Sequence, residues 1–297
     1  MVDSSIPRLR TALALSAGVV ALSFAAVLIR LTAAPALVIA AGRLTVASLV
    51  LAPFFWTRFG RIRPQLAGGR WLWVGLAGVF LAVHFALWVE SLRHTSVTSS
   101  VVLVAMDPLF VSLAAPLVLR ERPRWQTFLA VGLGVIGALL VAGPSLGSAL
   151  TTKGNLLALG GAACAAGYLL VGRRVRQEVE LVAYVYVMYT VAAVLLLLAV
   201  AVLRLPLAGY SISAYGFILL LGLGPQLIGH TSFNWALRYL TAPVVAMVIL
   251  FEPVGASLLA WLILHEPPTL TEVAGGVVIC AAIYLAVTAG FRRRFRM

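Results

Sequence analysis

The stretch LRHTSVTSSVVLVAMDPLFVSLAAPLVLRERP, residues 92–123, is repeated in outline 145 positions later by LRYLTAPVVAMVILFEPVGASLLAWLILHEPP, residues 237–268. The shared positions align without a gap: Leu92-Arg93 with Leu237-Arg238, Asp107-Pro108 with Glu252-Pro253, and Glu121 and Pro123 with Glu266 and Pro268. Each stretch contains an apolar run long enough to cross roughly 30 Å of hydrocarbon. We therefore expect two related halves, residues 1–150 and 151–297, each built around a membrane helix of this kind.

Composition also indicates a membrane environment. Of the 297 residues, 62% are hydrophobic and 10% are charged, whereas a soluble domain typically carries about 25% charged residues. The net charge of +13 does not indicate nucleic-acid binding, because the basic residues lie in short clusters between apolar runs. Such clusters orient membrane helices relative to the bilayer.

Ten apolar segments are long enough to span a bilayer. They cover residues 12–30, 34–57, 70–91, 96–119, 124–143, 154–172, 181–203, 213–237, 241–264 and 269–290. The first segment could be read as a signal peptide, since Arg8 and Arg10 precede it. Its apolar run is long for a signal and nine further segments follow, so we interpret it as a helix.

The distribution of Lys and Arg supports this number of segments. With the N-terminus in the cytoplasm, the outer connections carry only Arg30, Arg93, Lys153 and Arg204, and Arg43 lies within the second segment. The other 17 of the 22 basic residues fall on the inner side. Because positive residues concentrate in cytoplasmic connections, we expect ten helices with both termini in the cytoplasm and a location in the inner membrane.

Five segments in each half is an odd number, so the two halves must have opposite orientations in the bilayer. The loop with Arg120, Arg122 and Arg124 falls inside, while the corresponding segment 265–268 contains no Lys or Arg and falls outside. Inverted repeats of this kind are typical of secondary transporters, in which two related halves rock around a central site.

The chain resembles the EamA-type transporters of the drug/metabolite transporter superfamily over nearly its whole length. The residues that carry the resemblance are Gly42-Arg43-Leu44 with Pro53, Ala86-Leu87-Trp88 through Thr95-Ser96-Val97, Asp107-Pro108, Leu119-Arg120-Glu121-Arg122-Pro123, Phe233-Asn234-Trp235-Ala236-Leu237, Glu252-Pro253 and Leu264-His265-Glu266-Pro267. The resemblance implies a basket of ten helices around a central cavity, with the last helix of each half at the periphery. It also implies transport of amino acids, drugs or other small solutes, often outward, and does not identify the substrate.

Two carboxylates are predicted near the middle of the bilayer. Asp107 lies about 11 residues into the fourth segment, roughly 17 Å at 1.5 Å per residue, and Glu252 lies at the same depth in the ninth. Each precedes a proline, which tends to kink a helix. Charged residues within a membrane usually face the protein interior and are often functional, so both are candidates for proton coupling. The alternative is structural: they cap broken backbone or pair with Arg43.

Further polar residues in the apolar segments predict a binding surface. Gln226, His230 and Asn234 repeat at intervals of four, as do Phe80, His84 and Trp88, so each set shares one face of a helix. Polar faces in lipid must meet other helices or water; interhelical hydrogen bonding is the alternative to cavity lining. The substrate-binding candidates are Arg43, His84, Trp88, Gln226, His230 and Asn234; for Trp235 we favour an interfacial anchor.

Several patterns lead to no cofactor or metal site. Gly132, Gly134 and Gly137 spell G-x-G-x-x-G inside an apolar segment without a preceding strand, so close helix packing is the better account. Gly275 and Gly276 are expected to do the same in the last segment. Cys164 and Cys280 lie in apolar segments without metal-ligand spacing.

Three classes of function compete. A secondary transporter, plausibly proton-coupled, is favoured; no nucleotide-binding loop indicates direct use of ATP. An enzyme is disfavoured because H-E-x-x-H and G-x-S-x-G motifs are absent. A channel would show a longer series of pore-lining polar residues. The expected partners are a small-molecule substrate and membrane lipid, with no nucleic acid, in a monomer or homodimer.

Overall fold

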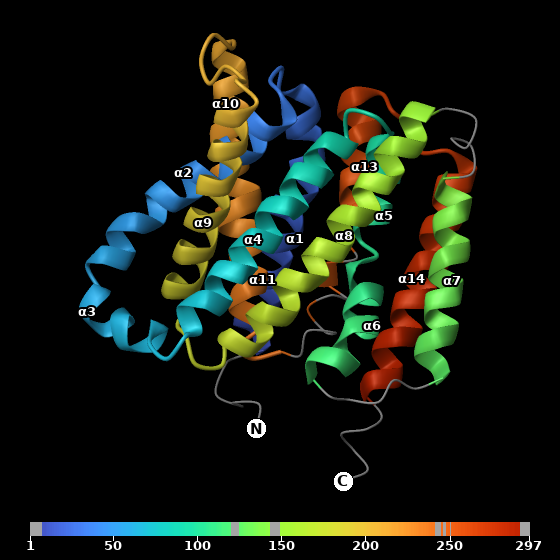
Figure 1. The fold of residues 1–297 in the computed structure, drawn as a ribbon. Helices are drawn as coiled ribbons and strands as arrows, with labels where there is room; N and C mark the ends of the chain where they lie inside the picture. The colour runs from blue at the N-terminus through green and yellow to red at the C-terminus, as the bar shows by residue number, and fades with distance from the viewer. Residues whose placement is uncertain are drawn as a thin grey trace.

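The computed structural model describes residues 8–119, 125–142, 149–240, 245, 248–249 and 251–291, and every regular element among them is a helix (Figure 1). The longer elements are α1 (Arg8–Leu31), α2 (Ala36–Trp56), α4 (Arg70–Ser91), α7 (Trp125–Ala142), α8 (Ala149–Val175), α9 (Leu181–Val202), α13 (Phe251–Leu264) and α14 (Leu270–Phe291). Six helical stretches are long and apolar enough to cross a membrane: α1 from Arg10, α2, α4, α8, α9 and 212–236. Shorter apolar helices complete an all-helical membrane protein.

The predicted fourth span is divided into two helices. Helix α5 (Val97–Val104) ends before Ala105 and Met106, and α6 (Asp107–Leu119) begins immediately after them. Pro108 therefore lies in the first turn of a new helix, where its missing N–H removes no helical hydrogen bond. The expected kink is in fact a break, and Asp107 lies at a helix N-terminus rather than in the middle of a continuous helix.

The predicted eighth span is irregular as well. Helix α10 (Ile212–Leu221) leads into a π-helical stretch, η3 (Gly222–His230), and then α11 (Thr231–Ala236). Pro225 lies inside η3, and proline within a helix disrupts the regular hydrogen bonds. π-helical turns occur frequently at functional sites, and this one contains two of the predicted binding residues.

Helix α3 (Phe59–Ile62) and the 3₁₀ turn η1 (Arg63–Leu66) mark one end of the molecule, here called the α3 end (Figure 1, lower). The loop between α8 and α9 lies at this same end, because Arg70 forms an ion pair with Glu178 and the side chain of Gln65 accepts a hydrogen bond from the backbone N–H of Glu180. The first residues of α1 and the last turns of α14 also lie there.

The opposite end joins connections from the two halves. Arg30, at the end of α1, donates to the backbone carbonyl of Leu92 and forms an ion pair with Glu266. Glu266 also accepts the backbone N–H of Val97, and Glu272 accepts the hydroxyls of Ser96 and Ser99. The first turn of α5 is thus held by carboxylates from the segment 265–272.

The apolar core has two parts. The larger cluster joins residues of α1, α2, α4, α8 and α9 with the 212–236 stretch and α13, and a smaller one lies between α5, α6, α7, α8 and α14. Helices α7 and α14 pack together at one edge (Figure 1, right). A Cβ on Gly137 would lie 2.9 Å from the carbonyl of Gly275, and one on Gly275 would lie 2.7 Å from the carbonyl of Gly137. Both glycines thus allow close packing, whereas a Cβ added to Gly132 would lie within 4 Å of no neighbouring element that the structure describes.

Candidate functional site

Arg43 is the centre of a buried polar cluster. Helix α2 is apolar around it, and the side chain is 0% exposed. Its guanidinium lies over the ring of Phe85, 4.2 Å from the ring centroid, and 5.9 Å from that of Trp88. A cation over an aromatic face is stabilised by the ring quadrupole, most strongly where water is excluded. The second span thus places a charge against an aromatic surface of the third.

That aromatic surface comes from α4. His84 stacks on Trp88 with ring centroids 5.9 Å apart, and its Nδ1 is 2.9 Å from the carbonyl oxygen of Gly161 on α8. Phe85 contacts the ring of His230 edge-on at 5.3 Å. Trp88 is 2% exposed, so it is part of the interior and not an interfacial anchor. These contacts join the first half of the chain to the second.

The irregular span 212–236 supplies the facing polar side chains. Gln226 and Asn234 are 0% and 1% exposed. A Cβ on Gly222 would lie 3.0 Å from the carbonyl of Arg43, so η3 packs directly against α2 at that residue. The hydroxyl of Tyr189, on α9, lies 3.1 Å from Thr231 Oγ1 and 3.5 Å from the carbonyl of Gln226.

The two predicted carboxylates lie at the edge of this cluster, each in the first turn of a helix. A negative charge at that position is favoured by the helix dipole. Glu252 is in electrostatic range of Arg43 and of Asp107, and both carboxylates are in range of Tyr168. No ion pair within 4.0 Å links Arg43 to a carboxylate in the described ranges. Pairing with Arg43, one structural alternative for these carboxylates, is therefore not seen among the described residues.

Many polar atoms of the cluster have no hydrogen-bond partner among the described residues. They are Nε, Nη1 and Nη2 of Arg43, Nε1 of Trp88, both amide atoms of Gln226 and Oδ1 of Asn234. The Asn234 amide nitrogen donates to the carbonyl of His230 within its own helix. Buried polar groups are nearly always paired, so each exception calls for an explanation such as a ligand or a functional role.

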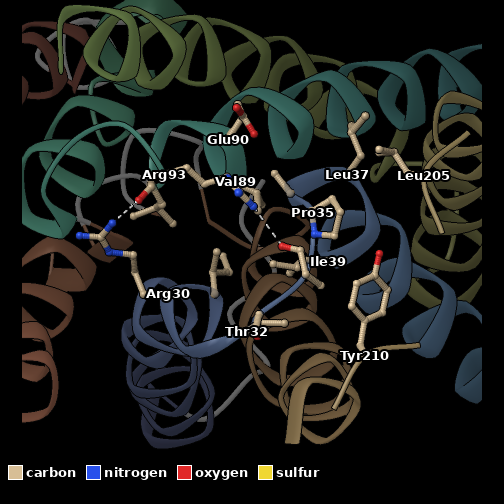
Figure 2. Close-up of a pocket in the computed structure, with 15 residues that line it drawn as sticks. Arg30, Thr32, Pro35, Leu37, Ile39, Val89, Glu90, Arg93, Leu205 and Tyr210 are labelled. Carbon is tan, nitrogen blue, oxygen red and sulfur yellow. Dashed lines mark hydrogen bonds between the residues drawn. The ribbon is translucent and has the colours of Figure 1, made fainter. Parts of the chain in front are cut away.

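A cavity of about 780 Å³ opens on the opposite end of the molecule from α3 (Figure 2). Arg30, Glu90 and Arg93 line it together with Tyr210, and Arg93 donates to the carbonyl of Ala34. None of the predicted binding residues lines it. Its lining includes Ile39, one helical turn before Arg43, and Val89, adjacent to Trp88. The cavity and the buried cluster therefore share helices α2 and α4.

Sequence reasoning identified Arg43, His84, Trp88 and His230, which the structure brings together through Phe85. It missed Phe85 and Tyr189, because an aromatic residue in an apolar helix gives no signal of its contacts. It also missed Arg176, which is 1% exposed and lies just after α8.

Glu121 and the basic residues Arg120, Arg122, Arg124 and 292–296 lie outside the described residues. Within the described chain no three His, Cys, Asp or Glu side chains gather as a metal site.

The architecture is that of a multi-pass membrane transport protein: apolar helices from two halves enclose a polar cluster. Residues 9–143 and again 152–288 match the EamA-like transporter family, so the chain belongs to that family and consists of two EamA halves. It is a transporter, not an enzyme, and a small-molecule substrate is implied.

The relatives agree with this assignment. An uncharacterized transporter of Archaeoglobus fulgidus is 25% identical over 213 residues, 72% of this chain and 75% of its own. The pseudopaline exporter CntI of Pseudomonas aeruginosa is 26% identical over 208 residues, 69% of this chain and 71% of its own. A crystal structure of a 19% identical protein aligns over 98% of this chain and 100% of its own with a TM-score of 0.66, which supports the fold alone.

Proposed function

We propose that the protein is a secondary transporter that exports a small solute across the inner membrane by alternating access. Its ten spans form two inverted repeats, divided near residue 150, with both termini in the cytoplasm. The observation that carries the proposal is the buried cluster between the halves. Arg43 and Trp88 come from the first half, and Gln226, His230 and Asn234 come from the second, so movement of one half against the other remodels the site.

The predicted residues have distinct roles in this proposal. Arg43, Gln226 and Asn234 contact the polar part of the solute, and His84, Trp88 and His230 form a wall for its apolar or aromatic part. Asp107 and Glu252 exchange protons as the halves move, because each lies at a helix N-terminus within electrostatic range of the cluster. Outward transport is supported by the Pseudomonas aeruginosa relative, which is a pseudopaline exporter.

The cluster and the cavity differ in their access to solvent. Arg43 and Gln226 are 0% exposed, so the cluster is closed, while the cavity lined in part by Ile39 is open to the end opposite α3. A carrier must close its site to one side before opening it to the other. Ile39 and Val89 lie where such closure separates the open cavity from the cluster.

The test is solute-driven proton flux in proteoliposomes that contain a pH-sensitive dye. A panel of amino acids, amines and nucleosides is added to the wild type and to Asp107→Asn and Glu252→Gln. The matched control is Glu178→Gln, since Glu178 is 62% exposed and pairs with Arg70 at the α3 end. We expect one solute class to evoke flux that the control retains and a carboxylate variant loses.

Labelled-solute exchange without proton flux would identify an uncoupled facilitator and give both carboxylates structural roles. Solute flux too fast for a conformational cycle would identify a channel. Either result would contradict the coupled mechanism while leaving the membership in the transporter family unchanged.

A further inference from the structure

The guanidinium of Arg43 is a buried cation without a hydrogen-bond acceptor among the described residues. It is 0% exposed, and none of its three nitrogens has a hydrogen-bond partner in the described part of the chain. An isolated charge in an apolar interior is strongly disfavoured unless it is paired and hydrogen-bonded. Its contact with the face of Phe85 stabilises the charge but accepts none of its N–H groups.

Among the described residues, the neighbouring unpaired side-chain atoms of the cluster are two donors and two acceptors, so donors are the majority once the three Arg43 nitrogens are added. Trp88 Nε1 and Gln226 Nε2 are buried and have no acceptor in the described residues, and together with Arg43 they provide donors from α2, α4 and η3. The unpaired acceptors are Gln226 Oε1 and Asn234 Oδ1. Because donors outnumber acceptors and one of them carries a positive charge, the missing partner is an anion with several oxygens.

The shape of the guanidinium further restricts the chemical groups that could be its partner. A planar guanidinium binds a carboxylate or phosphate through two parallel hydrogen bonds, a geometry that a neutral carbonyl group cannot reproduce. The guanidinium carbon lies 4.2 Å from the Phe85 ring centroid and 5.9 Å from that of Trp88, so aromatic rings cover one side of the group. The aromatic residues also offer a surface for an apolar or planar part of the same ligand.

A second buried arginine, Arg176, has hydrogen-bond acceptors within the protein. Arg176 donates from Nε to the carbonyl of Asn234 at 3.1 Å and from Nη1 to the carbonyl of Val179. At Arg43, Glu252 interacts electrostatically with the guanidinium but is not within ion-pair distance. Arg43 therefore has no hydrogen-bond acceptor among the described residues, at the boundary between the halves.

We propose that the Arg43 cluster recognises a carboxylate or phosphate group of a solute that also carries an apolar or aromatic part, with Trp88 Nε1 and the Gln226 amide as further donors. This rests on the proposed function, since it names the substrate class of the same site.

The test measures ligand-induced thermal stabilisation of the full-length protein in a non-ionic detergent. The probes are benzoate and phenyl phosphate, the neutral benzamide and benzyl alcohol, and the cationic benzylamine. Variants are Arg43→Gln, Arg43→Lys, which keeps the charge without the planar fork, and Arg176→Gln as the matched buried control. We expect the two anions to stabilise the wild type and Arg176→Gln, with affinity at least about 30-fold weaker in Arg43→Gln and intermediate in Arg43→Lys.

The proposal is overturned if the neutral or cationic probes stabilise the wild type as well as the anions do, if no probe stabilises it, or if the anion effect persists in Arg43→Gln. Labelled-solute exchange by the same preparations in proteoliposomes tests the transport function separately from the substrate class. Exchange without anion binding refutes the substrate class alone, whereas anion binding without exchange of any solute refutes transport and leaves the anion site.

Discussion

Arg43 and Arg176 are two arginines that the fold buries almost completely, and they differ in what their guanidinium groups contact. Arg176 ties the end of α8 to backbone carbonyls of Val179 and Asn234, near the α3 end of the molecule. Arg43 contacts an aromatic face and has no hydrogen-bond acceptor among the described residues. Burial alone therefore does not distinguish a structural arginine from a binding one. The two differ in whether the N–H groups of the guanidinium have acceptors within the protein.

The difference also shows how the two halves are used. Arg176 bonds carbonyls within the second half. Arg43 belongs to the first half, and its charge interacts with Glu252 of the second at more than ion-pair distance. In the proposed transport cycle, donors at the boundary between the halves are completed by a ligand in one conformation and by protein groups in another.

The largest effect is expected for Arg43→Gln. Solute exchange in proteoliposomes should fall by at least about 30-fold, because truncating one partner of a buried charged hydrogen bond costs roughly 2–5 kcal/mol in binding. The melting temperature should be unchanged or higher, because the substitution removes a buried charge with unpaired donors. A large loss of stability would show that Arg43 is a structural residue like Arg176.

The reverse outcome is expected for Arg176→Gln. Arg176 makes two hydrogen bonds, and hydrogen bonds from a charged group contribute about 1.5–3 kcal/mol each, so the variant should lose about 3–6 kcal/mol of unfolding free energy. Chemical denaturation in detergent measures the loss, and exchange per folded molecule should keep the wild-type apparent KM. A raised KM with normal stability would remove the distinction between the two arginines.

Phe85→Leu tests the closer of the two aromatic contacts described for the Arg43 guanidinium. The substitution keeps an apolar side chain and removes the cation–π interaction, which contributes about 0.5–2 kcal/mol. Anion affinity should therefore change by roughly 2- to 30-fold. Phe55→Leu is the matched control, since Phe55 stacks on Tyr186 away from the cluster; an equal effect of both changes would assign the loss to general packing.

The smallest effect is expected for Trp88→Phe. The change removes one neutral donor, Nε1, which corresponds to about 0.5–1.5 kcal/mol and a roughly 2- to 10-fold weaker affinity for an anion. Isothermal titration with the best-binding probe measures it. Trp235→Phe, on the shorter helix α11, serves as the control, and an unchanged affinity in Trp88→Phe would exclude Nε1 from the anion site.

The sequence was a good guide to the helices and to part of the cluster, for a shared physical reason. Long apolar runs must be helical in lipid because every backbone group needs an internal partner. Polar residues within them, such as Arg43, His84 and His230, must turn toward the interior. Three of the expected residues converge on Phe85 or Trp88 for that reason.

The remaining features depend on contacts that a periodic pattern does not encode. The break before Asp107 and the π-helical turn around Pro225 alter the backbone, although the apolar run continues through both. In the sequence, Arg176 belongs to the same basic cluster as Arg173 and Arg174, and no pattern sets it apart from them. Only the fold shows that its side chain is directed inward to meet the carbonyl of Asn234.

The close contact of Gly137 and Gly275 has a consequence for biogenesis. These glycines join the last helix of the first half to the last helix of the second, about 140 residues later in the chain. At translation rates of roughly 5–20 residues per second, α7 waits on the order of ten seconds before α14 emerges. During that interval its small-residue face has only lipid, the insertion machinery or other helices to contact, so the pairing of α7 with α14 belongs to the final stage of assembly.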